Sequence, residues 1–291
     1  MDRPRIGCIG LGAMGLPIAR RLLAAGFPVA VHNRSRANVE ALVALGAEAL
    51  GSPAEIASAS DIVLTALPTP DSVREVYLGE SGLLDGAREG SILIDLSTVR
   101  PALSREIAQV AGARGVAILD APISGGPEGA VNGTLTIMCG GDEAAFERAR
   151  PVFEVFGERI YYAGPSGAGC TIKLVNQLLV SIHAVATAEA LALAKQAGAD
   201  PELTFEVVRN SWGASRIFER SFPLMLAAND DGGANISIVL KDISVILDLA
   251  REIDLPLGVG AAAHDALAAA RDRGYGARDI AALRLLFAAD D

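Results

Sequence analysis

The sequence is poor in aromatic residues, cysteine and histidine, and each shortage narrows the class of protein. Aromatic residues make up only 4% of the 291 residues, so aliphatic side chains must fill the core. The three cysteines form no paired spacing, which excludes a disulfide framework and is typical of reduced thiols in the cytoplasm. The three histidines show no metal-ligand spacing, so we predict no metal site.

Positive charge is also scarce. The chain has 25 Lys and Arg residues against 35 Asp and Glu residues, a formal net charge of −10, and no basic run. Nucleic acid and anionic membranes are therefore not expected as partners. The most apolar segment, residues 178–194, contains Ser181, His183 and Glu189, so we do not expect it to span a membrane. We predict a soluble, cytoplasmic protein.

The pattern of apolar residues predicts an α/β fold over the first 164 residues. Short strand-like runs alternate there with stretches of helical periodicity, which is typical of a doubly wound sheet covered by helices on both faces. The strand-like runs are 5–9, 27–32, 62–66, 91–95, 116–120, 134–139 and 159–162, and the helical stretches are 14–25, 53–59, 70–77, 101–114 and 143–156.

The pattern changes after Gly164, where we find no further strand signal. Residues 169–196 form a long apolar segment, well beyond the ordinary helix of about 11 residues, which indicates a helix that bridges domains or subunits. Further helical stretches follow at 201–210, 236–253, 257–273 and 277–288. We therefore predict an α/β domain over 1–164 and an all-helical domain over 165–291, joined by the long interdomain helix.

The first strand-like run ends in a glycine-rich turn that opens the next helix. The turn has the pattern G-x-G-x-x-G and reads Gly10, Leu11, Gly12, Ala13, Met14 and Gly15. The first glycine permits the tight turn, the second lets the backbone approach a pyrophosphate, and the third lets the helix pack on the sheet. Free N–H groups at the helix N-terminus favour phosphate. A purely structural turn is the alternative, but the strand–turn–helix context favours a Rossmann-like, dinucleotide-binding domain.

The end of the second strand decides between the two nicotinamide dinucleotides. An acidic residue there would bind the ribose 2′-hydroxyl, whereas this chain has Asn33, Arg34 and Ser35. Arg34 can pair with a 2′-phosphate, so we favour NADP, with NAD possible; a solvated loop arginine is the alternative. Leu67, Pro68 and Thr98 follow later strands, at the edge of the sheet where the ligand crevice of such folds lies, and are further cofactor candidates.

Two segments carry candidate catalytic and substrate-binding groups. Ser124, Gly125 and Gly126 offer a hydroxyl and exposed backbone N–H groups suited to a carboxylate, although an ordinary glycine-rich turn is an equal alternative from this segment alone. Lys173, Asn176 and Gln177 lie at i, i+3 and i+4, on one face near the start of the long helix. An ammonium with two amides can hold and protonate a carbonyl oxygen, and burial favours lysine as an acid–base group.

Four motifs in this order resemble the β-hydroxyacid dehydrogenases, a family that includes 3-hydroxyisobutyrate dehydrogenases, tartronate semialdehyde (2-hydroxy-3-oxopropionate) reductases and glyoxylate reductases. They are the glycine turn, the run from Asp120 to Gly126, the run from Gly167 to Gln177, and the pair Lys241-Asp242. The resemblance implies that Lys173 is the catalytic lysine and that Lys241 approaches the cofactor. The commoner family pattern has Asn where this chain has Gln177, and the tartronate semialdehyde reductase branch carries the same Asn-Gln pair.

We therefore predict an NAD(P)-dependent enzyme that transfers hydride between the nicotinamide and a small β-hydroxy acid or its semialdehyde or keto form. The predicted partners are a small carboxylate substrate and further copies of this chain, as a dimer or tetramer. Trp212 could line the substrate pocket, but a core or interface tryptophan is at least as consistent with the sequence. An imine reductase-like enzyme is one alternative, although such enzymes usually lack the lysine; a non-catalytic dinucleotide-binding sensor is another.

Overall fold

The computed structural model describes residues 3–287 of the chain, which leaves residues 1–2 and 288–291 of the two predicted domains outside the described part. The chain divides into two compact units, residues 1–173 (the N-terminal unit) and 174–291 (the C-terminal unit). The division falls inside one helix, α9 (Ala168–Gln196), between Lys173 and Leu174. The predicted domain boundary between residues 164 and 165 stays a prediction.

The N-terminal unit is built on one sheet in the order β3-β2-β1-β4-β5-β6-β8-β7, with β9 paired to β8. All pairs from β3 to β6 are parallel, whereas β8 runs antiparallel to β6 and β7. The strands are β1 (Ile6–Ile9), β2 (Val29–His32), β3 (Glu48–Ala49), β4 (Ile62–Thr65), β5 (Ile92–Asp95), β6 (Ala117–Asp120), β7 (Ile123–Ser124), β8 (Leu135–Gly141) and β9 (Gly157–Gly164).

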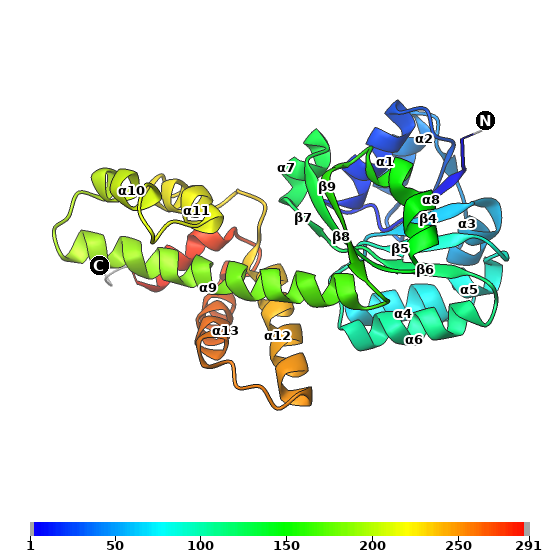
Figure 1. Ribbon diagram of the computed structural model, residues 1–291. Coiled ribbons are helices and arrows are strands. Elements are labelled where there is room, and N and C mark those ends of the chain that lie inside the picture. The colour runs from blue at the N-terminus through cyan, green and yellow to red at the C-terminus, as the bar shows by residue number, and fades with distance from the viewer. Residues whose placement is uncertain (1–2, 288–291) are drawn as a thin grey trace. The chain divides into compact units, whose positions relative to one another are not determined.

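Helices cover both faces of this sheet, which confirms the predicted α/β class (Figure 1). Strands β1, β4 and β5 are buried along their whole length, as expected for parallel strands covered on both sides. Helices α1, α2 and α8 pack on one face and α3 to α6 on the other. The helices are α1 (Gly15–Ala24), α2 (Arg36–Val43), α3 (Pro53–Ala59), α4 (Pro70–Leu78), α5 (Leu83–Gly86), α6 (Pro101–Gly112), α7 (Gly126–Asn132) and α8 (Glu143–Phe153).

Prolines in the first turn explain where several of these helices begin. Helices α3, α4 and α6 each start on a proline, whose missing N–H costs nothing in the first turn. Ser52 and Thr69 cap α3 and α4 by accepting a hydrogen bond from a backbone N–H of the first turn. Helix α7 was not predicted, because two glycines and a proline within seven residues are typical of a loop.

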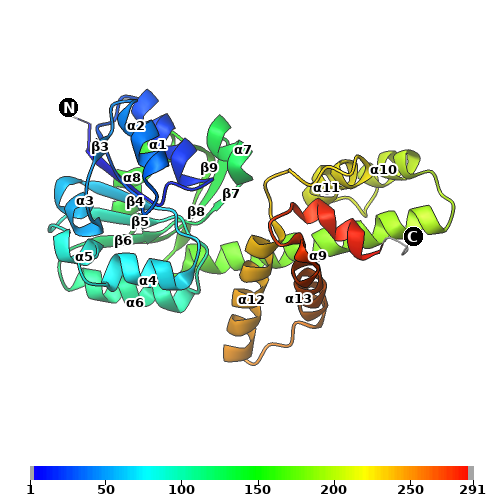
Figure 2. The same cartoon turned by 180° about the vertical axis from the view of Figure 1, so that it is seen from behind.

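The C-terminal unit contains only helices as regular elements among the described residues, as predicted. After α9 come α10 (Pro201–Arg209), α11 (Arg216–Leu226), α12 (Ile236–Glu252), α13 (Gly258–Ala270), a π-helical turn (Arg271–Tyr275) and a 3₁₀ helix (Ile280–Leu286). Helices α12 and α13 lie side by side (Figure 2). The predicted α-helix over 277–288 is instead the shorter 3₁₀ helix, and residue 288 lies outside the described residues.

Helix α11 was also missed by the sequence patterns, because Pro223 lies in its interior. Two features compensate for the proline. Ser215 caps the helix by accepting a hydrogen bond from the N–H of Phe218, and one face buries Phe218 and Phe222. Their rings pack against that of Phe205 on α10, so α10 and α11 form an aromatic-lined pair.

Helix α9 is long and apolar enough to cross a membrane by length and composition alone, although 44% of the relevant window is buried in the protein. Its buried side chains, among them Leu174, Ala188 and Leu191, belong to the core of the C-terminal unit. Core helices of soluble proteins pass the same test, and the packing of these side chains makes α9 part of that core. Val175, Leu179 and Leu193 on α9 remain exposed.

Candidate active site

The parallel strands of the N-terminal unit bring the predicted cofactor segments to one edge of the sheet. Because β2, β1, β4, β5 and β6 run in the same direction, the turns that follow them all leave the sheet at its carboxyl edge. These turns contain Asn33 after β2, Gly10 after β1, Leu67 after β4, Thr98 after β5, and the segment after Asp120 of β6.

The glycine turn after β1 has the geometry of a phosphate-binding turn. Gly10 has φ +84°, and a Cβ there would lie 2.3 Å from the carbonyl oxygen of Ala66. A Cβ at Gly15 would lie 2.0 Å from the carbonyl oxygen of Gly10, so only glycine lets α1 approach the strand. Gly12 is exposed and faces open space. Helix α1 starts without a side-chain cap, so its first N–H groups are available to an anion. The turn therefore fits the pyrophosphate of a dinucleotide.

Two asparagines, Asn33 directly after β2 and Asn38 on α2, hold this turn through hydrogen bonds. The Asn33 carboxamide oxygen accepts a hydrogen bond from the N–H of Leu11 at 3.1 Å, and Asn38 donates to the carbonyl oxygen of Leu11 at 2.6 Å. The sequence predicted Leu11 and Asn33 as cofactor contacts, and the structure shows that they contact each other. Asn38 was not predicted, because an asparagine inside a helical stretch carries no signal for such a long-range contact.

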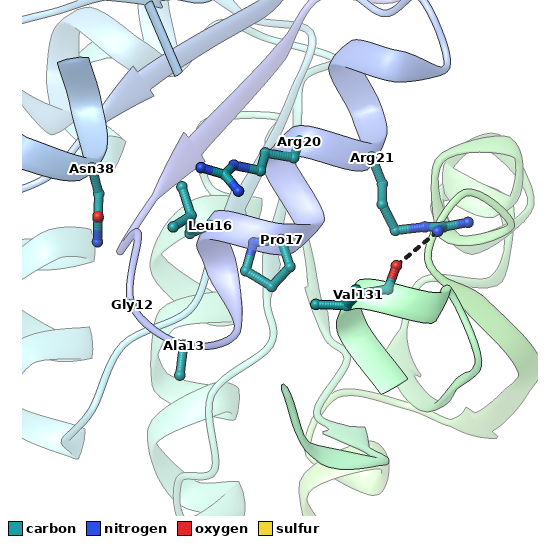
Figure 3. A pocket seen from close by; sticks show the side chains of 8 residues that line it. All are labelled: Gly12, Ala13, Leu16, Pro17, Arg20, Arg21, Asn38 and Val131. Atoms are coloured by element: carbon teal, nitrogen blue, oxygen red, sulfur yellow. Dashed lines mark hydrogen bonds between the residues drawn. The ribbon is translucent and has the colours of Figure 1, made fainter. Parts of the chain in front are cut away.

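A pocket of about 440 Å³ lies beside the glycine turn (Figure 3). The turn and α1 form one wall, Asn38 of α2 another, and Val131 of α7 a third. Arg21 of α1 donates to the carbonyl oxygens of Val131 and Val155, which ties α7 to α1. Helix α7 begins directly after Ser124 and Gly125, so the same arginine links the glycine turn with the predicted carboxylate segment.

The residues at the end of β2 present one exposed cation. Arg34 is exposed, and the hydroxyl of Ser35, at the start of α2, makes no capping hydrogen bond. The carboxamide nitrogen of Asn33 donates to the carbonyl oxygen of Ser35 at 3.0 Å, which fixes the loop between them. This arrangement leaves the guanidinium and the first turn of α2 open to an anionic group such as a 2′-phosphate.

A buried aspartate, Asp95, organises the turns after β4 and β5. Its Oδ1 accepts hydrogen bonds from the N–H and hydroxyl of Ser97 and from the hydroxyl of Thr65. The Ser97 hydroxyl in turn accepts a hydrogen bond from the N–H of Leu67 at 2.9 Å. Burial raises the pKa of Asp95 and these hydrogen bonds oppose the rise. Asp95 thus orders the backbone beside the predicted cofactor residues Leu67, Pro68 and Thr98.

The predicted carboxylate segment is an exposed glycine pair between β7 and α7. Ser124 is half-buried and its strand pairs with β8, while Gly125 and Gly126 are exposed with φ of +130° and +64°. Side chains are strained in that region of φ, and a Cβ at Gly126 would face open space. The backbone N–H groups of this segment are therefore accessible at the surface.

The start of α9 carries Lys173, which is 6% exposed. Asp120, the last residue of β6, accepts hydrogen bonds from the N–H of Gly167 at 2.7 Å and from the N–H of Cys170 at 2.9 Å. Burial raises the pKa of Asp120, and the two backbone hydrogen bonds oppose that rise. The sequence placed Asp120 in the substrate signature, whereas the structure shows it bound to the first turn of α9.

The other candidate residues belong to the C-terminal unit. Asn176 donates to the carboxamide oxygen of Gln177 at 2.9 Å, and the Gln177 amide donates to Asp242 of α12. Lys241 forms an ion pair with Asp242, with Nζ and Oδ1 2.7 Å apart. An ionised carboxylate accepts hydrogen bonds and donates none. Asp242 therefore binds the NH₂ end of the Gln177 side chain, which leaves the carboxamide oxygen of Gln177 to face Asn176. Asp242 is thus an additional candidate, which the Lys241-Asp242 motif contained without assigning it a role.

Trp212 is fully exposed in the loop between α10 and α11, so it lines no pocket within the C-terminal unit. The three cysteines are free and buried, and burial raises the pKa of Cys8 to about 12. Thiol chemistry is therefore not supported at neutral pH. The roles of the individual site residues stay predictions.

Comparison with known proteins identifies families for both halves of the chain. The family described as the NAD binding domain of 6-phosphogluconate dehydrogenase matches residues 5–164. The family described as "NAD-binding of NADP-dependent 3-hydroxyisobutyrate dehydrogenase" matches residues 167–286.

Curated relatives and solved structures agree with these families. The chain is 39% identical to 2-(hydroxymethyl)glutarate dehydrogenase of Eubacterium barkeri, over 96% of this chain and 93% of that one. It is 37% identical to 2-hydroxy-3-oxopropionate reductase of Escherichia coli, over 87% and 86%. The structure of a Mycobacterium tuberculosis 3-hydroxyisobutyrate dehydrogenase with L-serine is similar with a TM-score of 0.91, at 30% identity over 98% and 99%.

Imine reductases share the fold more distantly. The structure of an imine reductase from Pseudomonas sp. is similar with a TM-score of 0.62 at 23% identity, which shows the fold alone. The first three proteins match this chain over most of both lengths, and the family models together cover nearly all of it. The chain therefore belongs to the β-hydroxyacid dehydrogenase family of NAD(P)-dependent oxidoreductases.

Proposed function

We propose that this enzyme interconverts a small β-hydroxy acid and its semialdehyde or keto form, with Lys173 as the acid–base group. The observation that carries the proposal is the place of Lys173. It is a buried lysine on α9, and the start of that helix is bound to the end of β6, at the sheet edge where the glycine turn opens. A buried lysine at a ligand crevice has few structural uses and is suited to exchanging a proton with a substrate oxygen.

The N-terminal unit supplies the groups that would hold the dinucleotide. Gly12, Ala13 and Met14 offer backbone N–H groups to the pyrophosphate, and the loop ordered by Asp95 places Leu67 beside it. Arg34 would bind the 2′-phosphate, which favours NADP over NAD. The bound nicotinamide supplies or accepts the hydride.

The protein's own groups then handle the substrate. Ser124, Gly125 and Gly126 would hold its carboxylate through a hydroxyl and backbone N–H groups, which fixes the carbon that reacts. Lys173 would give a proton to the carbonyl oxygen in reduction and take the hydroxyl proton in oxidation. Asn176, at i+3 on the same helix, would orient the same oxygen, while Gln177 supports Asn176 because its own amide is held by Asp242.

The names of the similar proteins narrow the substrate class. 2-(Hydroxymethyl)glutarate, 2-hydroxy-3-oxopropionate and L-serine all carry a carboxylate and, one carbon further on, a CH₂OH or an aldehyde group. We therefore propose a carboxylate that bears a hydroxymethyl or formyl group on the neighbouring carbon.

A substrate screen tests this function. NADPH oxidation is followed with glyoxylate, succinic semialdehyde and tartronate semialdehyde, and NADP reduction with hydroxyisobutyrate, serine and threonate. We expect turnover with substrates that contain the shared fragment and none with a cyclic imine. Turnover of the imine alone would favour the imine reductase alternative, and cofactor binding without turnover of any compound would favour a sensor.

Self-association and location are also part of the proposal. Val175, Leu179 and Leu193 form an exposed apolar stripe on α9, and Leu203 of α10 and Trp212 add further exposed apolar surface in the same unit. Exposed apolar side chains of this kind are suited to an interface between subunits, so we propose that copies of the chain associate as a dimer or tetramer through the C-terminal unit. Free cysteines are consistent with the cytoplasm as the proposed compartment.

A further inference from the structure

The first turn of α9 is capped from outside its own sequence. Backbone N–H groups at a helix start need acceptors, and these usually come from a side chain directly before the helix. Here Asp120 supplies the acceptors for two of these groups: its Oδ1 accepts from the N–H of Gly167 and its Oδ2 from the N–H of Cys170, while the N–H of Ala168 donates to the carbonyl oxygen of Pro165. Asp120 is only 2% exposed, so water cannot replace it readily.

Close backbone packing fixes the same junction. A Cβ at Gly169 would lie 2.2 Å from the carbonyl oxygen of Met138 and 2.5 Å from that of Asp120. A Cβ at Gly140 would lie 2.8 Å from both the Asp120 Oδ1 and the N–H nitrogen of Gly169. The helix start is therefore pressed against β6 and β8 with no space for a side chain between them.

We propose that Asp120 is a positioning residue for the reaction. From the end of β6 it holds the start of α9 in the position that places Lys173 at the carboxyl edge of the sheet. Lys173 lies three residues after Cys170, less than one helical turn from the N–H group that the Asp120 Oδ2 caps. A shift of the first turn therefore carries the lysine with it. The inference rests on the proposed role of Lys173.

The neighbouring strand provides a matched control. Asp95 is the register partner of Asp120 on β5 and is likewise buried, but its hydrogen bonds go to Thr65 and Ser97 and, through the Ser97 hydroxyl, to the N–H of Leu67. Asp95 thus orders the cofactor turns and makes none of the hydrogen bonds at the start of α9. Asp95 therefore orders the cofactor loops, and Asp120 positions the lysine.

The test compares Asp120→Asn with Asp95→Asn in the full-length enzyme. In Asp120→Asn, we expect kcat to fall by about 10- to 100-fold, the size of effect that follows a misplacement of about 1 Å, while the KM for NADPH stays unchanged. NADPH with deuterium in the transferred position should show a larger isotope effect in this variant, because the chemical step becomes slower. In Asp95→Asn, the KM for NADPH should rise instead.

A second pair of variants moves the helix without touching the carboxylate. Gly169→Ala should lower kcat as Asp120→Asn does, because its methyl group pushes α9 from the sheet; Gly112→Ala, where a Cβ meets nothing within 4 Å, should have no effect. Thermal unfolding checks that each variant folds.

Three outcomes would overturn the inference. These are a kcat in Asp120→Asn within about threefold of the parent enzyme, the same pattern of kcat and KM in both aspartate variants, or failure of both Asp120→Asn and Gly169→Ala to fold. An active Lys173→Ala variant would refute the proposed function itself, whereas an inactive Lys173→Ala beside a fully active Asp120→Asn would refute only this inference.

Discussion

Asp95 and Asp120 of the N-terminal unit and Asp279 of the C-terminal unit are buried aspartates with different hydrogen-bond partners. In the N-terminal unit, Asp95 and Asp120 lie at the ends of adjacent strands and accept hydrogen bonds from hydroxyl and backbone N–H groups, and burial raises both pKa values. In the C-terminal unit, Asp279 is also buried, but it accepts hydrogen bonds from both terminal guanidinium nitrogens of Arg220, at 2.9 and 2.7 Å. Burial alone would raise the pKa of Asp279, and the hydrogen bonds from Arg220, Ala281 and Ala234 outweigh it, so the pKa is lowered.

Asp95 and Asp120 thus order the candidate site, whereas Asp279 stabilises the fold. A carboxylate whose folded pKa is raised destabilises the folded state at neutral pH, and the loss is recovered only as pH falls below that pKa. In the N-terminal unit, Asp95 and Asp120 cause this loss of stability at the carboxyl edge of the sheet. Asp279 has a lowered folded pKa, so its contribution is fully present at neutral pH and is lost as pH falls below the unfolded value.

The largest effect is expected at Lys173, in the N-terminal unit. Lys173→Ala removes the proposed proton donor but leaves the glycine turn intact, so kcat should fall by about 10²–10⁴-fold with little change in NADPH affinity. Steady-state kinetics and a fluorescence titration of NADPH measure the two quantities. Activity within about threefold of the parent enzyme would contradict the assignment.

In the C-terminal unit, Asp279→Ala should lower the stability of the fold and leave the kcat of the folded enzyme unchanged. Removing the buried carboxylate leaves two backbone N–H groups without their acceptor and the half-buried Arg220 without its counter-charge, so the free energy of unfolding should fall by about 3 kcal/mol. Urea denaturation measures this change at pH 7.

Asp248→Ala is the control for this prediction, because the Arg251–Asp248 pair on α12 is exposed and should contribute about 0.5 kcal/mol or less. The difference between Asp279→Ala and the parent should also shrink below about pH 4, where the unfolded aspartate becomes protonated. An unchanged difference at low pH would show that Asp279 acts through packing and not through its charge.

At the end of β2, Arg34→Ala should reduce cofactor discrimination. If Arg34 binds the 2′-phosphate, loss of its charge-assisted hydrogen bonds should raise the KM for NADPH by about 10- to 100-fold and leave the KM for NADH unchanged. Arg251→Ala, which removes an exposed arginine of α12 in the other unit, is the control and should leave both KM values unchanged. Equal or better catalytic efficiency with NADH in the parent enzyme would show that Arg34 does not select the cofactor.

On the exposed stripe of α9, we expect an effect on association and none on the chemical step. Sedimentation at micromolar concentration should give at least a dimer, well above the 30.0 kDa monomer. Leu179→Asp should weaken association, because an interface leucine contributes about 1.5–3 kcal/mol when fully buried. A fully active monomeric parent would contradict the proposed self-association, and Arg273→Ala, away from the stripe, should leave the mass unchanged.

Sequence patterns predicted the local parts of this molecule well. Prolines at the starts of α3, α4 and α6, and the apolar runs of β1, β4 and β5, act over a few residues and were read from the chain directly. Four helices were missed: the short helices α2 and α5, and α7 and α11, in which glycine or proline outweighs weak periodicity. Tertiary packing overrides such local preferences when a helix face can be buried.

The sequence by itself determined the α/β and all-helical halves, the glycine turn, and Lys173 on a long helix, because strand alternation, glycine spacing and helical periodicity are local properties. Only the tertiary structure decided what holds these groups. Asp120 binds a helix start 47 residues further on, Gln177 reaches Asp242 65 residues away, and Arg220 pairs with Asp279 across 59 residues. Such partners depend on which strands are neighbours and which helix faces meet, and no local pattern encodes that choice.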